Sequence, residues 1–433
     1  MRIEIKDKKK FIKMFNSIHI NNKISRINGV SIDSRKVMKN DIFFPVKGEN
    51  YDGHKFINDS LKKGAIVSFS EINTNNKNVI KTKSIKNEIH KLVRKWRELS
   101  KSKIIGITGS NGKTTAKNLL YHLLDNKFNC NKTIGNYNSL IGFPISFLSS
   151  RLDDDYSILE YGASKPNEIK HLCKIISPDY SLITNISNAH IKNYKSFKEL
   201  FDTKYALYIS TKSNGTIFIN SDQLKIKDSI DNRRIISFGY RNNAKLINNY
   251  LLINNKKISI PENIAYLKDI ILSTYIISNY LGISNQEFEN SLKSFSPSIG
   301  RGNYMKLNKF TLIDDSYNAN PNSVKFAIDR LSNININGKK IFILGDMLEL
   351  GDIEVNEHNK LAHTFNESNI DIILTYGNLS KDIHKNIHKQ KYSKHYYNKN
   401  KLKNELNNLV CKNDLIYLKG SRSMKLENLF IKN

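Results

Sequence analysis

A glycine-rich turn at residues 106–115 carries the clearest chemistry in this sequence. It reads GITGSNGKTT, follows an apolar stretch at 103–107, and precedes a segment whose apolar residues recur at helical spacing. Glycines let backbone N–H groups turn toward phosphate oxygens, and a helix start adds positive potential. Lys113 can supply a charge for the outer phosphates, and Thr114 a hydroxyl for Mg²⁺. The turn therefore predicts a binding site for a nucleoside triphosphate.

The glycine spacing differs from that of the standard phosphate-binding loop. That pattern would place glycine at position 107, where this chain has isoleucine. A strand before the turn and a helix after it still favour phosphate binding over an unrelated loop. We predict that ATP is held by Gly109, Ser110, Asn111, Gly112, Lys113, Thr114 and Thr115.

Two further groups follow predicted strands and could hold a cation beside the triphosphate. The stretch 156–159 ends in Glu160, and the stretch 180–183 leads to His190. Ligands of open α/β sheets bind at the carboxyl ends of the strands, so both groups are expected to face Lys113. Carboxylate and hydroxyl oxygens suit Mg²⁺, while imidazole is a less usual ligand. Thr114, Glu160 and His190 are therefore the predicted Mg²⁺ ligands.

The chain is too long for a single hydrophobic core. Its 433 residues suggest about three domains, which we place at 1–84, 85–298 and 299–433. The first carries short strands and turns, with a helix expected at 56–63 that ends at Gly64. The second alternates strands and helices as a parallel α/β sheet does. The third repeats that rhythm, with strands expected at 310–313, 340–344, 370–375 and 415–418, as a Rossmann-like domain without its glycine fingerprint. The predicted fold class is α/β throughout.

The formal charge of +29 raises the question of nucleic-acid binding. Lysine is spread over every segment together with much Asn and Ile, which is typical of a compositional bias. Two readings stay open: a basic ATPase that binds nucleic acid, and an enzyme whose charge attracts anionic substrates. We expect no nucleic-acid partner, because no recognition motif for DNA or RNA is present.

Cysteine use and hydropathy indicate the compartment. The three cysteines lie far apart and form no C-x-x-C pair, which argues against a disulfide framework and fits a reducing cytoplasm. No apolar run approaches the roughly 20 residues that cross a bilayer. Residues 1–14 are charged and lack the apolar core of a secretory signal. We expect a cytoplasmic protein, not inserted in a membrane, and a monomer.

Several motifs along the chain resemble those of the Mur ligase family, ATP-dependent amide-forming enzymes of peptidoglycan assembly. The resemblance runs nearly end to end. Its motifs in the second domain are GITGSNGKTT at 106–115, GNYN at 135–138, IGFP at 141–144, LEYGA at 159–163 and NISNAH at 185–190. The last domain has three motifs similar to those of the family branch that adds D-alanyl-D-alanine to UDP-N-acetylmuramoyl-tripeptide. They are DDSYNANPNS at 314–323, LGDMLELG at 344–351 and KGSR at 419–422.

The resemblance implies a two-step reaction. The tripeptide carboxylate attacks the γ-phosphate of ATP to give an acyl phosphate and ADP, and the amine of D-alanyl-D-alanine then displaces phosphate. Lys113 and His190 have catalytic roles in this reaction, with Lys204 as a carbamylated metal ligand and Arg301 as an arginine that reaches the ATP phosphates. Asp315 is implied to bind the ribose. The implied substrate-binding residues are Ser34, Arg35, Asp52, Gly53, His54, Asn136, Asn138, Asn318 and Asn320.

Some points stay open at this level. Lys204 is either that metal ligand or an ordinary surface lysine, because its neighbours Tyr205 and Ala206 differ from the family pattern. The family's H-N-x-x-N motif is missing near 261–269, so the adenine contacts are unassigned. The third residue of the tripeptide, lysine or diaminopimelate, is not specified. A family member that adds a single amino acid, or a folylpolyglutamate-type ligase, is the rival within enzymes.

Overall fold

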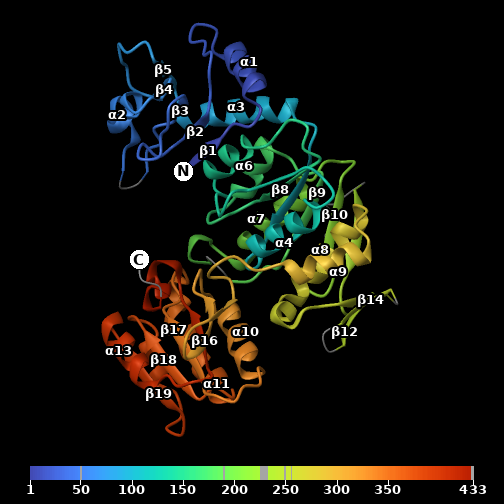
Figure 1. Ribbon diagram of the computed structural model, residues 1–433, viewed down its shortest axis with the longest axis vertical. Helices are drawn as coiled ribbons and strands as arrows, with labels where there is room; N and C mark the ends of the chain where they lie inside the picture. The colour runs from blue at the N-terminus through green and yellow to red at the C-terminus, as the bar shows by residue number, and fades with distance from the viewer. Residues whose placement is uncertain (49–50, 189–190, 225–232, 248–249, 255, 431–433) are drawn as a thin grey trace.

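Short apolar runs separated by turns rich in Gly, Asn and Asp form three successive large β-sheets in the computed structural model, with a small three-stranded sheet beside the second (Figure 1). The structure describes residues 1–48, 51–188, 191–224, 233–247, 250–254 and 256–430. The three sheets follow one another along the long axis of the molecule, from the N-terminal segment in blue to the C-terminal segment in red. The predicted succession of α/β units is therefore confirmed.

The first sheet has the order β1-β2-β3-β4-β5, with β1 antiparallel to β2 and the others parallel. Its strands are β1 (Arg2–Glu4), β2 (Gly29–Ser31), β3 (Asp41–Phe43), β4 (Val67–Ser70) and β5 (Val79–Lys81). The helices beside them are α1 (Lys8–Ile18), α2 (Ile57–Lys62) and α3 (Ile85–Leu99). The helix predicted at 56–63 is α2, which follows a 3-10 turn (Gly53–Phe56) and ends before Gly64 at a positive φ of 101°.

Helix α3 joins the first sheet to the second. Ser84 caps it by accepting a hydrogen bond from the backbone of Asn87, and Trp96 is fully buried on its apolar face. One hydrophobic core cluster extends from Met1 to Leu224 and includes this face. The first sheet therefore shares its core with one face of the second (Figure 1).

The second sheet is entirely parallel, in the order β11-β10-β9-β6-β8-β7. Its strands are β6 (Lys103–Thr108), β7 (Cys130–Lys132), β8 (Tyr156–Glu160), β9 (Tyr180–Ile183), β10 (Thr216–Asn220) and β11 (Arg234–Phe238). The helices of this region are α4 (Lys113–Leu124), α5 (Gly142–Phe147), α6 (Glu168–Ile175), α7 (Phe197–Ile209), α8 (Lys268–Tyr280) and α9 (Asn285–Ser294). The strands predicted at 103–107, 156–159 and 180–183 are β6, β8 and β9.

A small antiparallel sheet adjoins the second sheet. Its strands were not predicted from the sequence. Its strands are β12 (Ala244–Ile247), β13 (Tyr250–Ile253) and β14 (Lys256–Ser259). Alternate residues of these strands enter the core cluster that also contains the apolar face of α4. Only one face of the small sheet is buried, so its sequence lacks the continuous apolar runs of the parallel strands.

The third sheet has the order β15-β16-β20-β17-β18-β19 and is parallel except for β15. Its strands are β15 (Asn303–Lys306), β16 (Phe310–Asp315), β17 (Lys340–Gly345), β18 (Ile372–Tyr376), β19 (Tyr392–Tyr396) and β20 (Asp414–Lys419). Its helices are α10 (Pro321–Ser332), α11 (Glu354–Asn366), α12 (Lys381–Lys385) and α13 (Lys399–Leu409). The strands expected at 310–313, 340–344, 370–375 and 415–418 are β16, β17, β18 and β20, while the edge strands β15 and β19 were not predicted.

The third sheet has its own core. Two apolar clusters cover its two faces, and within the described residues neither includes a side chain from before residue 305. Hydrogen bonds join this unit to the second domain, among them Arg301 Nη2 to the Thr114 hydroxyl and Asn320 Nδ2 to Asn111 Oδ1. No helix in the described part of the chain is long and apolar enough to span a membrane.

Candidate active site

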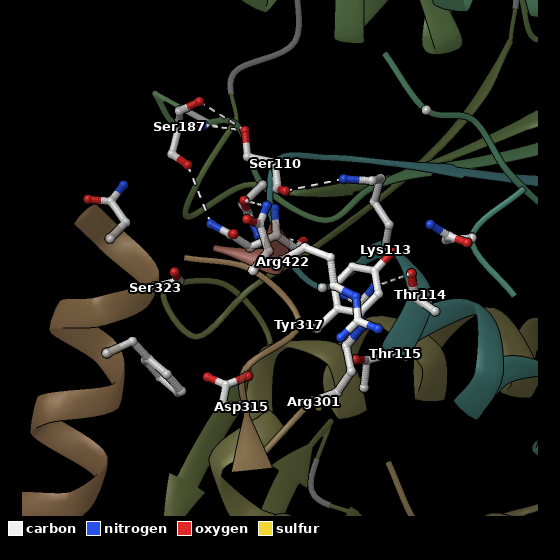
Figure 2. A pocket seen from close by; sticks show the side chains of 18 of the residues that line it. Ser110, Lys113, Thr114, Thr115, Ser187, Arg301, Asp315, Tyr317, Ser323 and Arg422 are labelled. Carbon is white, nitrogen blue, oxygen red and sulfur yellow. Dashed lines mark hydrogen bonds between the residues drawn. The ribbon is translucent and has the colours of Figure 1, made fainter. Parts of the chain in front are cut away.

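A cavity of about 1160 Å³ lies where the glycine-rich turn faces the carboxyl ends of the third sheet (Figure 2). Its lining includes residues of the turn, of the loop after β7, and of the turns that follow β16 and β20. Typical sites for a single small ligand measure roughly 300–1,000 Å³. The cavity is therefore large enough for more than one substrate.

The glycine-rich turn links β6 to α4 through two residues of unusual backbone geometry. Gly109 has a φ of 150° and Gly112, directly before α4, has a φ of 80°. A side chain at Gly109 would collide with the Thr184 hydroxyl, so the turn packs closely against the segment after β9. Left-handed geometry at Gly112 directs the chain into the helix, whose first N–H groups border the cavity.

The segment after β9 holds the turn in place. Asn185 accepts a hydrogen bond from the backbone N–H of Asn111 at 3.0 Å and donates to the Asn111 carbonyl at 3.0 Å. Ser110 and Ser187 are joined by two hydrogen bonds, from the Ser110 hydroxyl to the Ser187 carbonyl and from the Ser187 N–H to the Ser110 hydroxyl. These supports fix the turn's shape before any ligand binds.

Lys113 folds back over the turn that precedes it. Its Nζ donates to the carbonyls of Gly109 at 2.7 Å and Ser110 at 3.2 Å. Burial lowers the pKa of Lys113, and the nearby Glu160 carboxylate opposes part of that shift. The ammonium group is thereby held at the cavity wall, where the triphosphate is predicted to bind.

Thr114 and Glu160 meet as predicted. The Thr114 hydroxyl donates to Glu160 Oε2 at 2.8 Å, and Asn138 Nδ2 donates to Glu160 Oε1 at 2.7 Å. No cluster of three acidic, histidine or cysteine side chains that could hold a metal occurs within the described residues. A hydroxyl and one carboxylate nevertheless suit Mg²⁺, because that ion usually keeps several waters and completes its shell with substrate phosphates.

Arg301 reaches the turn from the start of the third domain. Its Nη2 donates to the Thr114 hydroxyl at 3.0 Å, and its guanidinium stacks 3.8 Å from the centre of the Tyr317 ring. Figure 2 shows this side chain extending toward Thr114. The Tyr266 hydroxyl donates to the Arg301 carbonyl at 3.1 Å. Thr114 thus contacts a carboxylate and a guanidinium from different parts of the chain.

Asp315 lies at the end of β16, on the opposite side of the cavity. Lys419 Nζ donates to Asp315 Oδ2 at 2.6 Å and to the Asn318 carbonyl at 3.2 Å, and the Tyr417 hydroxyl also donates to Asp315. Asn318 lines the cavity. The structure therefore brings both predicted binding residues to one wall, with Lys419 as their shared partner.

Asn320 takes part in contacts that its predicted role did not anticipate. Its Oδ1 accepts from the backbone of Ser323 and caps α10, while its Nδ2 donates to Asn111 Oδ1 at 2.6 Å. Both ends of the amide are thereby used within the protein. The side chain ties the third domain to the glycine-rich turn.

Lys204 lies beneath the turn on α7. Its side chain is 2% exposed, and its Nζ lies 3.5 Å from the Gly109 carbonyl. Burial, together with the charge of Lys113, lowers the pKa of Lys204 to about 7. The reading of an ordinary surface lysine is therefore wrong, while its carbamylation stays a prediction. His190, the other predicted metal ligand, lies outside the described residues.

The predicted uridine-nucleotide residues lie in the first domain, apart from the cavity. Arg35 pairs with Asp33 at 2.9 Å, and this hydrogen-bonded ion pair holds the pKa of Asp33 down to about 2. Asp52 Oδ1 accepts from the backbone N–H of His54 at 3.0 Å and contacts its ring Nδ1 at 2.8 Å, around Gly53. Ser34 is buried, and its backbone carbonyl accepts a hydrogen bond from Lys63 Nζ, at the end of α2, at 3.0 Å.

His358 fixes the turn after β17, beside the cavity wall at Leu348. Its Nε2 accepts from the backbone N–H of Met347 at 3.0 Å, and its Nδ1 lies 2.7 Å from the Glu354 carbonyl. This arrangement requires a neutral ring that carries its proton on Nδ1. Burial lowers the pKa of His358 below the ordinary value of about 6.5.

We expect the free energy of unfolding to fall as the pH drops from about 7.5 to 5.5. In that window His358 becomes protonated in the unfolded chain but stays neutral in the native protein. Where the two states differ by one full proton, the free energy of unfolding falls by about 1.4 kcal/mol per pH unit. His358→Gln keeps an acceptor for Met347 and should flatten this slope. His363→Gln, an exposed position of the same helix, is the control. Urea unfolding at each pH measures the difference, and equal slopes would contradict the assignment.

Comparison with known proteins places the chain in a family. Residues 26–101, 107–282 and 300–422 match, in turn, the Mur ligase family catalytic domain, the Mur ligase middle domain, and the Mur ligase glutamate ligase domain. The UDP-N-acetylmuramoyl-tripeptide–D-alanyl-D-alanine ligase of Buchnera aphidicola subsp. Baizongia pistaciae is 32% identical over 377 residues, 82% of each chain. The chain belongs to the Mur ligase family.

Two other Mur ligases extend the similarity. The UDP-N-acetylmuramoyl-tripeptide–D-alanyl-D-alanine ligase of Bacillus subtilis is 30% identical over 93% of this chain and 92% of its own. The crystal structure of MurF ligase from Thermotoga maritima in complex with ADP has a TM-score of 0.80 at 26% identity, covering 92% of this chain and 95% of that one. The family predicted from the motifs is confirmed, and these relatives carry the name of the predicted branch.

Proposed function

We propose that this protein joins D-alanyl-D-alanine to UDP-N-acetylmuramoyl-tripeptide and converts ATP to ADP and phosphate. The observation that best supports the proposal is that the Thr114 hydroxyl is hydrogen-bonded both to Glu160 on β8 and to Arg301 from the third domain. It gathers a hydroxyl, a carboxylate and a cation at the start of a phosphate-binding helix. The names of the relatives supply the substrates. The free thiols of all three cysteines fit a cytoplasmic location for this reaction.

In the first step an oxygen of the tripeptide carboxylate forms a bond to the γ-phosphorus, and the bond to ADP breaks. Both reactants are anionic, so the step needs neutralised charge and enforced proximity. Lys113 and Arg301 supply fixed positive charge at the cavity wall. Thr114 and Glu160 would hold Mg²⁺, with His190 and a carbamylated Lys204 as further candidates, and the ion would neutralise phosphate charge.

In the second step the dipeptide amine attacks the acyl carbon. A C–N bond forms, the bond to phosphate breaks, and the nitrogen loses a proton. We propose that Asn318 and the neighbouring turn after β16 hold the dipeptide, and that Asp315 binds the ribose of ATP. Asn136 and Asn138, which border the same cavity, would bind the tripeptide end of the UDP substrate. Ser34, Arg35 and the 52–54 turn would hold its uridine nucleotide.

We expect rapid phosphate release only when ATP, Mg²⁺, UDP-N-acetylmuramoyl-tripeptide and D-alanyl-D-alanine are all present. A coupled phosphate assay with each component omitted in turn measures this, and mass spectrometry identifies the product as the sum of both substrates less one water. Single amino acids in place of the dipeptide test the rival ligase. A rate of ATP hydrolysis that does not depend on the dipeptide but increases when DNA or RNA is added would support a nucleic-acid-dependent ATPase instead.

A further inference from the structure

A second lysine of α4 is buried beside the catalytic cluster. Lys117 lies one helical turn after Lys113 and Thr114, on the same side of the helix, and its side chain is 1% exposed. Its Nζ donates to the carbonyls of Thr133 at 2.7 Å and Gly135 at 2.6 Å. The same Nζ lies 3.7 Å from Glu160 Oε2.

Burying an ammonium group is costly unless its donors are satisfied. Lys117 Nζ donates hydrogen bonds to two carbonyls and lies within ion-pair distance of the Glu160 carboxylate, and these contacts offset that cost. Burial lowers the pKa of Lys117 to about 8, and the charge of Glu160 opposes that shift. A methionine would fill the same volume without the desolvation cost, so packing alone does not require lysine here.

The two carbonyls belong to the loop at 133–138, which follows β7 and borders the cavity. Gly135, at the bend of the loop, is exposed and has a φ of 52°. On either side of the bend, the Ile134 N–H donates to the Ser146 hydroxyl at 2.7 Å, and Tyr137 packs against the apolar core. The Thr133 hydroxyl accepts from the backbone N–H of Glu160 at 2.9 Å, and Asn138 donates to the Glu160 carboxylate. The loop is therefore tied to Glu160 at both ends and to Lys117 at its bend.

We propose that Lys117 is a positioning residue that fixes the 133–138 loop against Glu160, so that Asn136 and Asn138 are preorganised for the UDP-linked substrate. The inference rests on the proposed function, because it assigns this loop to that substrate. Lys117 itself does not line the cavity. It acts through the loop and through the carboxylate that the loop orients.

The test replaces Lys117 with methionine and compares the variant with Lys132→Met. Lys132 is a half-buried lysine on the adjacent strand β7, and its Nζ lies over the Tyr121 ring at 3.9 Å, away from the loop carbonyls. For Lys117→Met we expect the KM for UDP-N-acetylmuramoyl-tripeptide to rise about tenfold or more. The KM for D-alanyl-D-alanine should stay within twofold. Lys132→Met should keep both values.

A purely structural role would give another pattern. It would lower the melting temperature and the fraction of active enzyme, and so kcat, while the KM for the UDP substrate stayed unchanged. A UDP-substrate KM for Lys117→Met within twofold of the control overturns the proposal.

A second variant decides the question if Lys117→Met does not fold. Gly135→Ala leaves the buried lysine intact and meets no atom within 4 Å, but it disfavours the positive φ of the bend. We expect the same rise in the UDP-substrate KM, smaller in size, at an unchanged dipeptide KM. An unchanged UDP-substrate KM in this variant also overturns the proposal. A wild-type enzyme without phosphate release from the three substrates would instead refute the proposed function, before any variant is compared.

Discussion

Replacing Lys113 with methionine is expected to lower kcat/KM for ATP by about 1000-fold, the upper end for removal of one preorganised electrostatic group. Lys113 Nζ is anchored on the carbonyls of Gly109 and Ser110, so its charge has a fixed position at the cavity wall. A fixed charge needs no reorganisation when negative charge shifts onto the leaving ADP. Methionine has a similar length and no charge, so the loss reports electrostatics rather than a cavity.

The size of this effect corresponds to about 4 kcal/mol of transition-state stabilisation. Folding should not suffer, because the variant removes a partly buried cation rather than an apolar side chain. Lys170→Met, at an exposed position on α6, is the matched control for a lost lysine. Initial rates of phosphate release over a range of ATP concentrations give kcat/KM for both variants. A decrease of less than fivefold for Lys113→Met, at an unchanged melting temperature, would show that the charge is not used.

Much of the fold follows from local patterns in the sequence. The parallel strands β6, β9 and β17 are mostly apolar and are followed by turn residues, and they were predicted to within one or two residues. Edge strand β19 was missed because its Tyr-Ser-Lys-His-Tyr sequence is half exposed and lacks such a run. The same reason applies to β15, of which two residues are exposed. A strand that is buried on both faces has a nearly continuous apolar sequence and can be predicted from it. An edge strand is partly exposed and has no such sequence.

The site was predicted in its parts but not in its connections. The turn at 106–115 and Glu160 were identified because groups that follow parallel strands meet at one edge of the sheet. The position of Lys117 beside Glu160 was not predicted, because helix α4 was predicted only from the spacing of its apolar residues. The bond between Asn111 and Asn320 joins residues 209 positions apart, and no local spacing specifies it. Such contacts depend on how the domains pack, which a single sequence does not encode in its periodicity.

The relation between the domains leads to the second large effect. The third sheet keeps its own apolar core, and hydrogen bonds join its domain to the glycine-rich turn. Arg301 makes the most direct of these, from Nη2 to the Thr114 hydroxyl, while Tyr317 supports its guanidinium. The same side chain thus serves as a link between domains and as a cation beside the triphosphate site.

Arg301→Ala is expected to lower kcat by roughly 100-fold, because a cation delivered from a second domain stabilises phosphoryl-transfer charge only when it is in place. Arg301→Lys keeps the charge but loses the planar fork and the stacking on Tyr317, so an intermediate loss of about tenfold is expected. Arg234→Ala is the matched control, since that arginine also stacks on a tyrosine, 5.1 Å from the Tyr280 ring centre, but is not among the residues that line the cavity.

The balance between kcat and KM separates the two roles of Arg301. If its charge acts in the transition state, kcat falls while the KM for ATP changes little. If Arg301 only holds the domains together, the alanine variant loses affinity for ATP and for the dipeptide alike, and saturating substrate restores kcat. Steady-state rates with each substrate varied in turn distinguish the two cases. A full kcat for Arg301→Ala at saturation would remove Arg301 from the chemistry and leave Lys113 as the main cation of the phosphoryl transfer.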